Sequence, residues 1–165
     1  MQVLQAAAAG GLPATVLRLF TVFGPRQRPD MAQHRFCTAL LYGEPLTVIG
    51  AGADVRDYLY VQDACAAIMT SLDRIPVAEI INVGSGSGIT LDSLLALLSR
   101  LTGKPPLIRH QKADANDTAF LLADIAKAER LLGWKPLVDL ETGLKIFIDW
   151  LKKIQKPDKK EWCSP

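Results

Sequence analysis

Arg56 is the residue whose type and surroundings best suit a chemical role in this chain. It lies at the expected entrance of a strand, after Gly50-Ala51-Gly52 and directly before Asp57-Tyr58. A guanidinium is a planar fork of hydrogen-bond donors that stays charged at any working pH, which suits a diphosphate group. The alternative is a surface ion pair with Asp54 or Asp57.

A second candidate group follows Thr21, where Arg26 and Arg28 stand in a proline-rich stretch. Two positive charges beside a turn could approach a phosphate, but solvated loop charges explain them equally well. His34, a few residues later, has no acid and nucleophile arranged around it in the sequence. We therefore interpret His34 as a surface or packing residue of a helix, not as an acid–base catalyst.

The glycine-rich segment 84–88 has the position of a dinucleotide-binding loop but not its spacing. Gly84, Gly86 and Gly88 follow an expected strand and precede an expected helix, where backbone amides can hold a pyrophosphate. Ile89 occupies the place of the third glycine, and no acid follows about 20 residues later at a strand end. We interpret the segment as a structural turn.

Composition and charge exclude several classes of protein. The chain has 165 residues, 49% of them hydrophobic, enough for one sizeable core. Its net charge of +2 arises in residues 151–165, which carry five lysines and two acids, so a nucleic-acid-binding surface is not expected. Three separated cysteines argue against disulfides and against a metal site. No apolar run reaches membrane-spanning length, and we expect a cytoplasmic protein without a membrane partner.

The order of expected elements is an alternation of helices and strands. Helices are expected over 1–9, 30–42, 62–72, 90–101, 124–132 and 140–154, and strands over 14–20, 46–49, 57–61, 78–83 and 107–109. The two most apolar strands, 14–20 and 78–83, are typical of a parallel sheet buried on both faces. So few parallel strands leave open sheet edges, which predicts burial against a second copy or a partner. Residues 1–154 are expected to form one unit, followed by a disordered basic tail over 155–165.

Several blocks of the sequence resemble one known family. They are Thr21-Val22-Phe23-Gly24-Pro25-Arg26-Gln27-Arg28-Pro29-Asp30-Met31, Arg56-Asp57-Tyr58-Leu59-Tyr60-Val61-Gln62-Asp63, Asn116-Asp117 and Leu131-Leu132-Gly133-Trp134. Together they are similar to the C-terminal, substrate-binding portion of NAD-dependent nucleotide-sugar epimerases and dehydratases, UDP-glucose 4-epimerase-like members of the extended short-chain dehydrogenase/reductase family. The resemblance implies an α/β fold: a partial Rossmann-type parallel sheet with the family's small C-terminal α/β substrate domain. The resemblance also implies that this sequence lacks the family's N-terminal dinucleotide-binding half.

The same resemblance implies site residues. Arg56 would bind the diphosphate, Tyr58 of the same block would also bind substrate, and Thr47, Val48 and Ile49 would form the wall of the nucleoside pocket. Thr21 stands where many relatives have an asparagine that contacts the sugar nucleotide, and Arg26 would contribute to substrate binding. Asp114 stands where relatives often have an arginine or glutamine for a second phosphate contact. Lys112 or Arg109 would then substitute, or affinity would be weakened. Leu19 and Phe20 would contact NAD only in a completely assembled site.

The sequence contains no catalytic pair of the family type. The family uses Tyr-x-x-x-Lys, whereas the residues four positions after Tyr42, Tyr58 and Tyr60 are Leu46, Gln62 and Ala64. No residue is assigned a catalytic role, and NAD belongs to the parent family, not to this chain alone. We expect a UDP-sugar-binding portion that is not catalytic alone, with UDP-hexose 4-epimerisation as the preferred parent reaction and dehydration second. Its expected partner is another copy or a complementing N-terminal half. The alternative is a non-enzymatic, self-associating or partner-binding module that no longer binds nucleotide.

Overall fold

The fold consists of six helices and eight strands in the described part of the chain. The computed structural model describes residues 2–11, 14–50, 52–74, 79–111 and 119–154. The helices are α1 Gln2–Gly10, α2 Ala32–Tyr42, α3 Val61–Asp73, α4 Leu91–Thr102, α5 Ala126–Leu132 and α6 Leu140–Ile154. The strands are β1 Thr15–Leu19, β2 Thr21–Phe23, β3 Pro45–Ile49, β4 Val55–Tyr60, β5 Glu79–Val83, β6 Gly88–Thr90, β7 Leu107–Gln111 and β8 Phe120–Leu121.

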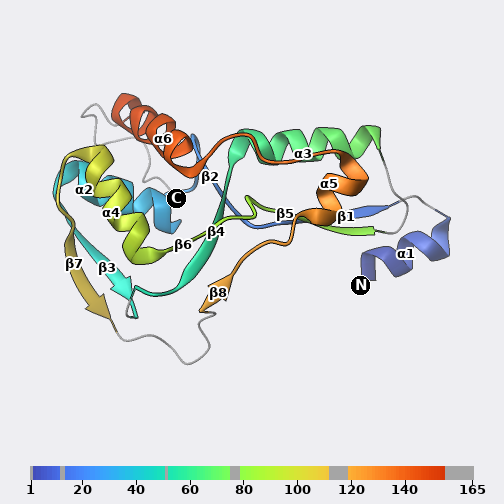
Figure 1. The fold of residues 1–165 in the computed structure, drawn as a ribbon, viewed down its shortest axis with the longest axis horizontal. Helices are drawn as coiled ribbons and strands as arrows, with labels where there is room; N and C mark the ends of the chain where they lie inside the picture. Colours follow the sequence, from blue (N-terminus) through green and yellow to red (C-terminus); the bar gives the residue numbers. More distant parts are fainter. Residues whose placement is uncertain (1, 12–13, 51, 75–78, 112–118, 155–165) are drawn as a thin grey trace, which may run out of the picture.

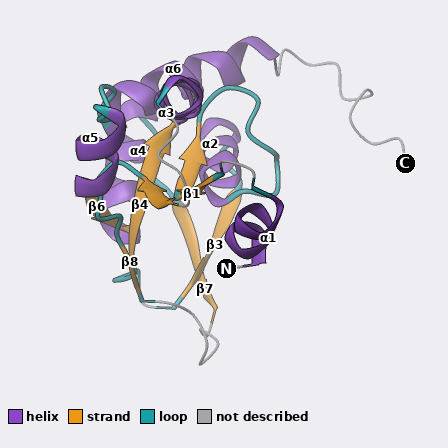
Figure 2. Ribbon diagram, turned by 90° about the vertical axis from the view of Figure 1, so that its right-hand side faces the viewer, coloured by secondary structure: helices purple, strands orange, loops and turns teal. Residues whose placement is uncertain are grey.

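The strands form small, mostly parallel groups instead of one continuous sheet. β1 pairs in parallel with β5, and β3 pairs in parallel with β7. β4 is the centre of the third group, where it pairs in parallel with β2 and β8 and antiparallel with β6. α5 and α1 lie on opposite sides of the β1–β5 pair (Figure 1; Figure 2). The fold is therefore mixed α/β with parallel strands, as the sequence predicts.

Strand β4 separates two apolar cores. The larger core is built by α2, α4 and α6 with β3, and the smaller one by α3 and α5 with β5. Successive side chains of a strand point to opposite faces. Tyr58 and Tyr60 accordingly pack in the larger core, and Leu59 between them packs in the smaller one. β4 thus connects the two groups of elements that lie at the left and right of Figure 1.

The expected strand 14–20 corresponds to β1 alone, and a separate strand, β2, begins at Thr21. β1 ends at Leu19, Phe20 donates its N–H to the Val83 carbonyl at 2.9 Å, and β2 then joins β4. The expectation of burial on both faces is wrong for β1, since none of its residues is buried and Leu19 is 45% exposed. The physical reason is that β1 has a strand neighbour on one side only among the described residues. Its parallel pairing with β5 is confirmed.

The helix ends follow the expected signals. Gly43 and Gly103 end α2 and α4 in the left-handed conformation, at φ +69° each. The Thr90 hydroxyl accepts a hydrogen bond from the Ser93 N–H and caps α4. The short strands β2, β6 and β8 were not predicted, because two or three residues carry too little pattern. The expected tail 155–165 lies outside the described residues.

Two features are absent from the described residues. No helix there is long and apolar enough to cross a membrane. No group of three or more His, Cys, Asp or Glu side chains there could hold a metal ion.

Candidate functional site

One hollow of the molecule lies where β1 ends and β2 begins. This first hollow has a volume of about 750 Å³ and is lined by residues 18–28 together with Met31, Val61 and Leu121. It brings together four residues that the sequence assigns to a site, Leu19, Phe20, Thr21 and Arg26. Because these four residues belong to one continuous lining segment, a short stretch of sequence was enough to predict them.

The first hollow is positively charged. Arg18, Arg26 and Arg28 line it, and none of the described residues in its lining is acidic. Arg28 pairs with Asp30 at 3.4 Å, but both side chains are mostly exposed, so this ion pair is weak. Arg18 and Arg26 form no ion pair within the described ranges. An anionic ligand is therefore favoured here.

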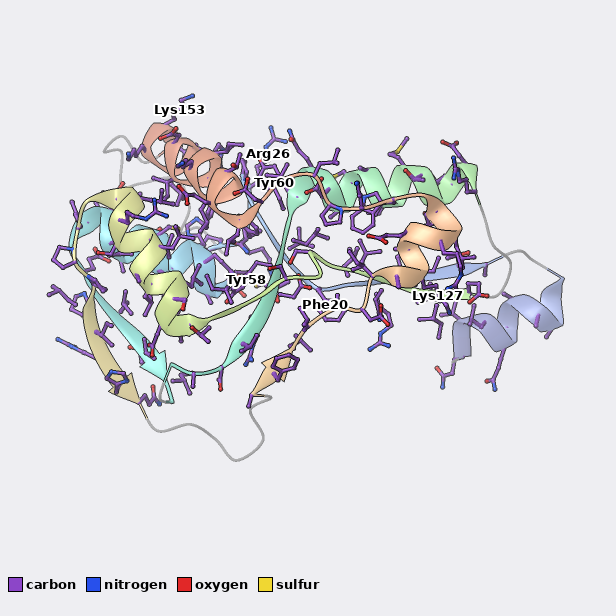
Figure 3. The ribbon with its side chains drawn as sticks, viewed as in Figure 1. Phe20, Arg26, Tyr58, Tyr60, Lys127 and Lys153 are labelled. Carbon is purple, nitrogen blue, oxygen red and sulfur yellow. The ribbon has the colours of Figure 1, made fainter. Side chains whose placement is uncertain are left out.

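Arg26 stands in a strained turn. The Gln27 N–H donates to the Gly24 carbonyl at 3.1 Å, which closes a four-residue turn with Pro25 in second place. Arg26 has φ +69° and is the only non-glycine residue of the described part with a positive φ. Figure 3 labels Arg26 near the start of α3, and Arg26 and Val61, the first residue of α3, both line the first hollow. Strained backbone conformations often occur at functional sites, which motivates a binding role for this residue.

Arg56 lies on β4 and is not itself among the residues that line the first hollow. Its Cα is opposite that of Leu121 on β8, and Leu121 lines the hollow. Thr21 is opposite Tyr58 on the other side of β4, two residues or about 7 Å farther along that strand. The Arg56 side chain is 27% exposed, lies 3.6 Å from Asp54 and donates to the Val55 carbonyl at 3.0 Å. Of the two carboxylates that the sequence offers, the structure therefore pairs Arg56 with Asp54.

The glycine-rich loop faces inward, toward Asp57. The carboxylate of Asp57 is fully buried and accepts hydrogen bonds from the Ser85 N–H at 2.7 Å and the Gly86 N–H at 3.0 Å. A pyrophosphate would need these same amides. The loop does not fit the phosphates of NAD, in agreement with its interpretation as a structural turn.

Tyr58 lines a second, smaller hollow. This second hollow, of about 430 Å³, lies among Tyr58, residues 85 and 87–89, and residues 136–140. Burial raises the pKa of Tyr58, against smaller lowering effects of the Arg56 charge and the Gln33 amide. A tyrosine held in its neutral form is a poor proton acceptor at neutral pH. Tyr58 is thus available for contact through its hydroxyl, not as a base.

The residues expected to form the nucleoside wall lie apart from both hollows. Val48 is buried in the larger core, Ile49 is half exposed, and Thr47 is intermediate. Val48 is only 1% exposed as a whole residue, so the structure does not show it open to a ligand. Lys112 lies outside the described residues.

Sequence reasoning missed three residues around the first hollow. Arg18 was hidden in an apolar strand, and nothing in the sequence shows on which side of β1 it is exposed. Gln27 and Gln33 lie in the Thr21–Met31 block and just after it, yet only the fold brings their side chains together, 3.3 Å apart. The one sequence signal that could have indicated Arg18 is its charge within an otherwise apolar strand, which is typical of an edge strand.

Comparison with known proteins agrees with the geometry. A model of the NAD dependent epimerase/dehydratase family matches residues 1–84. The chain belongs to this family. A relative from Thermodesulfobacterium geofontis, UDP-glucuronate 4-epimerase, is 36% identical over 144 residues, which are 87% of this chain and 44% of the relative.

Solved structures of the NAD-dependent epimerase/dehydratase family superpose closely on this chain. UDP-glucose 4-epimerase from Thermotoga maritima, in complex with UDP-glucose, has a TM-score of 0.89 and 34% identity, over 93% of this chain and 50% of that one. UDP-glucuronic acid 4-epimerase from Bacillus cereus, in complex with UDP-glucuronic acid and NAD, has a TM-score of 0.88 and 32% identity, over the same shares. The chain spans about half the length of these family members.

Proposed function

We infer that this chain supplies the UDP-sugar-binding part of an NAD-dependent UDP-hexose 4-epimerase and does not epimerise a sugar alone. The observation that carries the proposal is the first hollow, where three arginines gather around Thr21 without any acid among the described lining residues. Arg56 adjoins it through Leu121 and would bind the diphosphate. Thr21 and Arg26 would contact the sugar end of the ligand.

The charge of the first hollow supports a hexuronate as the sugar. A neutral hexose needs hydroxyl-bonding groups, whereas Arg18, Arg26 and Arg28 add three positive charges beyond Arg56. A carboxylate on the sugar would complement them, since guanidinium and carboxylate match in shape as well as charge. The names of relatives from Thermodesulfobacterium geofontis and Bacillus cereus, both epimerases of UDP-glucuronate, favour the same choice.

The residues of this chain would not carry out the NAD-dependent reaction of the family by themselves. The NAD of the family accepts and returns a hydride. This chain would offer Leu19 and Phe20, which line the first hollow, as contacts to that cofactor in an assembled site. It has no Tyr-x-x-x-Lys pair, and the amides of the glycine-rich loop are bonded to Asp57. A complementing N-terminal half would have to supply the glycine-rich NAD loop and the base.

Calorimetric titration with UDP, UDP-glucose, UDP-glucuronate and NAD tests the binding proposal. We expect UDP-glucuronate to bind most tightly and NAD not to bind. Arg56→Ala should weaken UDP binding about 10- to 100-fold, because a charge-assisted phosphate contact is lost. Arg130→Ala, on the exposed end of α5, is the matched control and should leave affinity unchanged. Absence of nucleotide binding, or an Arg56→Ala variant that binds normally, would sink the proposal.

The free edge of β1 favours a second candidate, a partner-binding module. β1 pairs only with β5 in the described part, and Leu19 at its end is 45% exposed. A strand from a complementing N-terminal half, or from another copy, would satisfy this edge. Size-exclusion mass and NAD-dependent turnover after mixing with an N-terminal half of a relative separate the possibilities. A stable oligomer that ignores every nucleotide would favour the non-enzymatic module.

A further inference from the structure

The turn that carries Arg26 is supported by hydrogen bonds of two glutamine side chains. The Gln27 Nε2 group donates to the Val22 carbonyl at 3.0 Å and to Gln33 Oε1 at 3.3 Å. Val22 belongs to β2, and Gln33 is fully buried on α2. The residue that follows Arg26 is thereby tied to two elements of the fold at once.

These contacts act at the place where the backbone is strained. A turn with proline in second place and positive φ in third place normally has glycine or asparagine there. Arg26 occupies that third place with φ +69°. An arginine stays in such a conformation only when its surroundings over-determine it. The backbone bond from Gln27 to Gly24 and the two side-chain bonds of Gln27 are the contacts that do so.

A gain in folding stability does not explain the glutamine pair. Gln27 Oε1 is buried and has no hydrogen-bond partner among the described residues, and Gln33 Nε2, also buried, makes no hydrogen bond of good geometry there although the Gln33 amide interacts with the Tyr58 hydroxyl. A buried amide with half of its capacity unmet is disfavoured relative to an apolar side chain of similar volume. The orientation of the two amides is nevertheless fixed. If the oxygen and nitrogen of the Gln33 amide were exchanged, its NH₂ group would face the NH₂ group of Gln27. A positional role explains the pair better than a stabilising one.

We propose that Gln27 and Gln33 are positioning residues that hold Arg26 in the left-handed turn and so keep its guanidinium at the first hollow, toward the sugar end of the ligand. This inference rests on the proposed function for the identity of the ligand. The structural part, that the amide pair holds the turn, stands independently of it.

A double-mutant cycle with UDP-glucuronate tests the positioning role. Gln27→Met, which keeps the volume but removes the donors, should weaken UDP-glucuronate binding about tenfold, as Arg26→Ala does, and leave UDP binding unchanged. In the Arg26→Ala background, Gln27→Met should have no further effect. Gln33→Met should behave as Gln27→Met does. Additive effects, or equal losses for UDP, mean that the pair serves the fold only and overturn the inference.

A thermal comparison tests the same inference without any ligand. Arg26→Gly should unfold about 2–4 °C above Arg26→Ala, because only glycine takes positive φ without strain. In the Gln27→Met background this gap should shrink or reverse, because the released turn can relax. An unchanged gap overturns the proposed hold on the turn even if UDP-glucuronate binds, and a closed gap supports it even if no nucleotide binds. Gln5→Met, on the exposed face of α1, should change neither measurement.

Discussion

The carboxylate of Asp57 holds Ser85 by two hydrogen bonds of 2.7 Å, one from the backbone N–H and one from the hydroxyl. Its second oxygen accepts the N–H of Gly86 at 3.0 Å and of Ala123 at 3.2 Å. One fully buried side chain thus joins β4, the glycine-rich loop and the segment after β8. The same strand presents Arg56 one position earlier, where its side chain pairs with Asp54 and takes no part in the contacts of Asp57.

Asp57→Asn should destabilise the protein strongly. The substitution keeps the shape but sets an NH₂ group against N–H donors, and it leaves buried amides without an acceptor. We expect a loss of about 2–4 kcal/mol in the free energy of unfolding, measured with urea. Asp73→Asn, at the exposed end of α3, is the control and should stay within about 0.5 kcal/mol. If Asp57→Asn also changed the free energy of unfolding by no more than about 0.5 kcal/mol, the structural role of the Asp57 carboxylate would be contradicted.

Gly143→Ala in α6 should destabilise the protein, although alanine normally favours a helix by about 1 kcal/mol. An added Cβ would lie 2.7 Å from Phe23 Cζ and 2.9 Å from Tyr60 Cδ2 in the larger core. Overpacking of this kind costs about 1–3 kcal/mol, which outweighs the helix preference. Urea unfolding measures the balance. Gly103→Ala isolates the backbone cost, because its Cβ would meet nothing within 4 Å while φ is +69°. A more stable Gly143→Ala variant would mean that α6 is not packed so closely.

His34 should make stability fall between neutral and mildly acid pH. Its ring is buried against Phe147, with centroids 5.9 Å apart, and burial lowers its pKa below the ordinary value of 6.5. The unfolded chain then binds the proton more readily, so the contribution is complete above pH 6.5 and is lost as pH falls from there through the lowered pKa. Urea unfolding at pH 7.5 and 5.5 should show a smaller drop for His34→Gln than for the wild type. His110→Gln, at an exposed position, should leave the drop unchanged.

Glu141 should stay ionised well into acid solution. Hydrogen bonds from Arg100 and Lys145 lower its pKa to about 2, with Arg100 2.7 Å and Lys145 2.8 Å away. The attraction is present above the ordinary carboxyl pKa of 4.5 and disappears as pH falls toward 2. A carboxyl NMR titration measures this directly, and Arg100→Gln should raise the midpoint. Because the group is at the surface, salt should weaken the effect, and a midpoint near 4.5 in the wild type would refute the pairing.

Local signals in the sequence predicted most element ends correctly. Thr90 and the glycines at 43 and 103 mark helix ends through chemistry that involves only nearby residues. The boundary between β1 and β2 depends on which strands lie alongside, β5 for β1 and β4 for β2. Periodicity carries no information on partners, which is why β1 was predicted and the three-residue strand β2 after it was not.

The residues of the candidate site likewise include some that the sequence predicted and others that only the structure revealed. Arg26 and Thr21 were found because their block resembles a family, and the structure brings both to one hollow. Whether Arg56 binds a diphosphate, whether Tyr58 contacts the ligand and whether Thr47 to Ile49 line a nucleoside pocket remain predictions. Gln27 and Gln33 were missed because glutamine carries no pattern of its own, and their contact depends on how α2 packs beside the turn.

By itself, the sequence determined the α/β class, the family and the absence of a Tyr-x-x-x-Lys pair, because these depend on residue types and on spacing along the chain. Only the tertiary structure decided that Asp57 binds the glycine-rich loop, that Arg56 pairs with Asp54, and that Arg26 is held at positive φ. Each of these depends on distances between residues that are neighbours in space, and such distances follow from packing instead of composition.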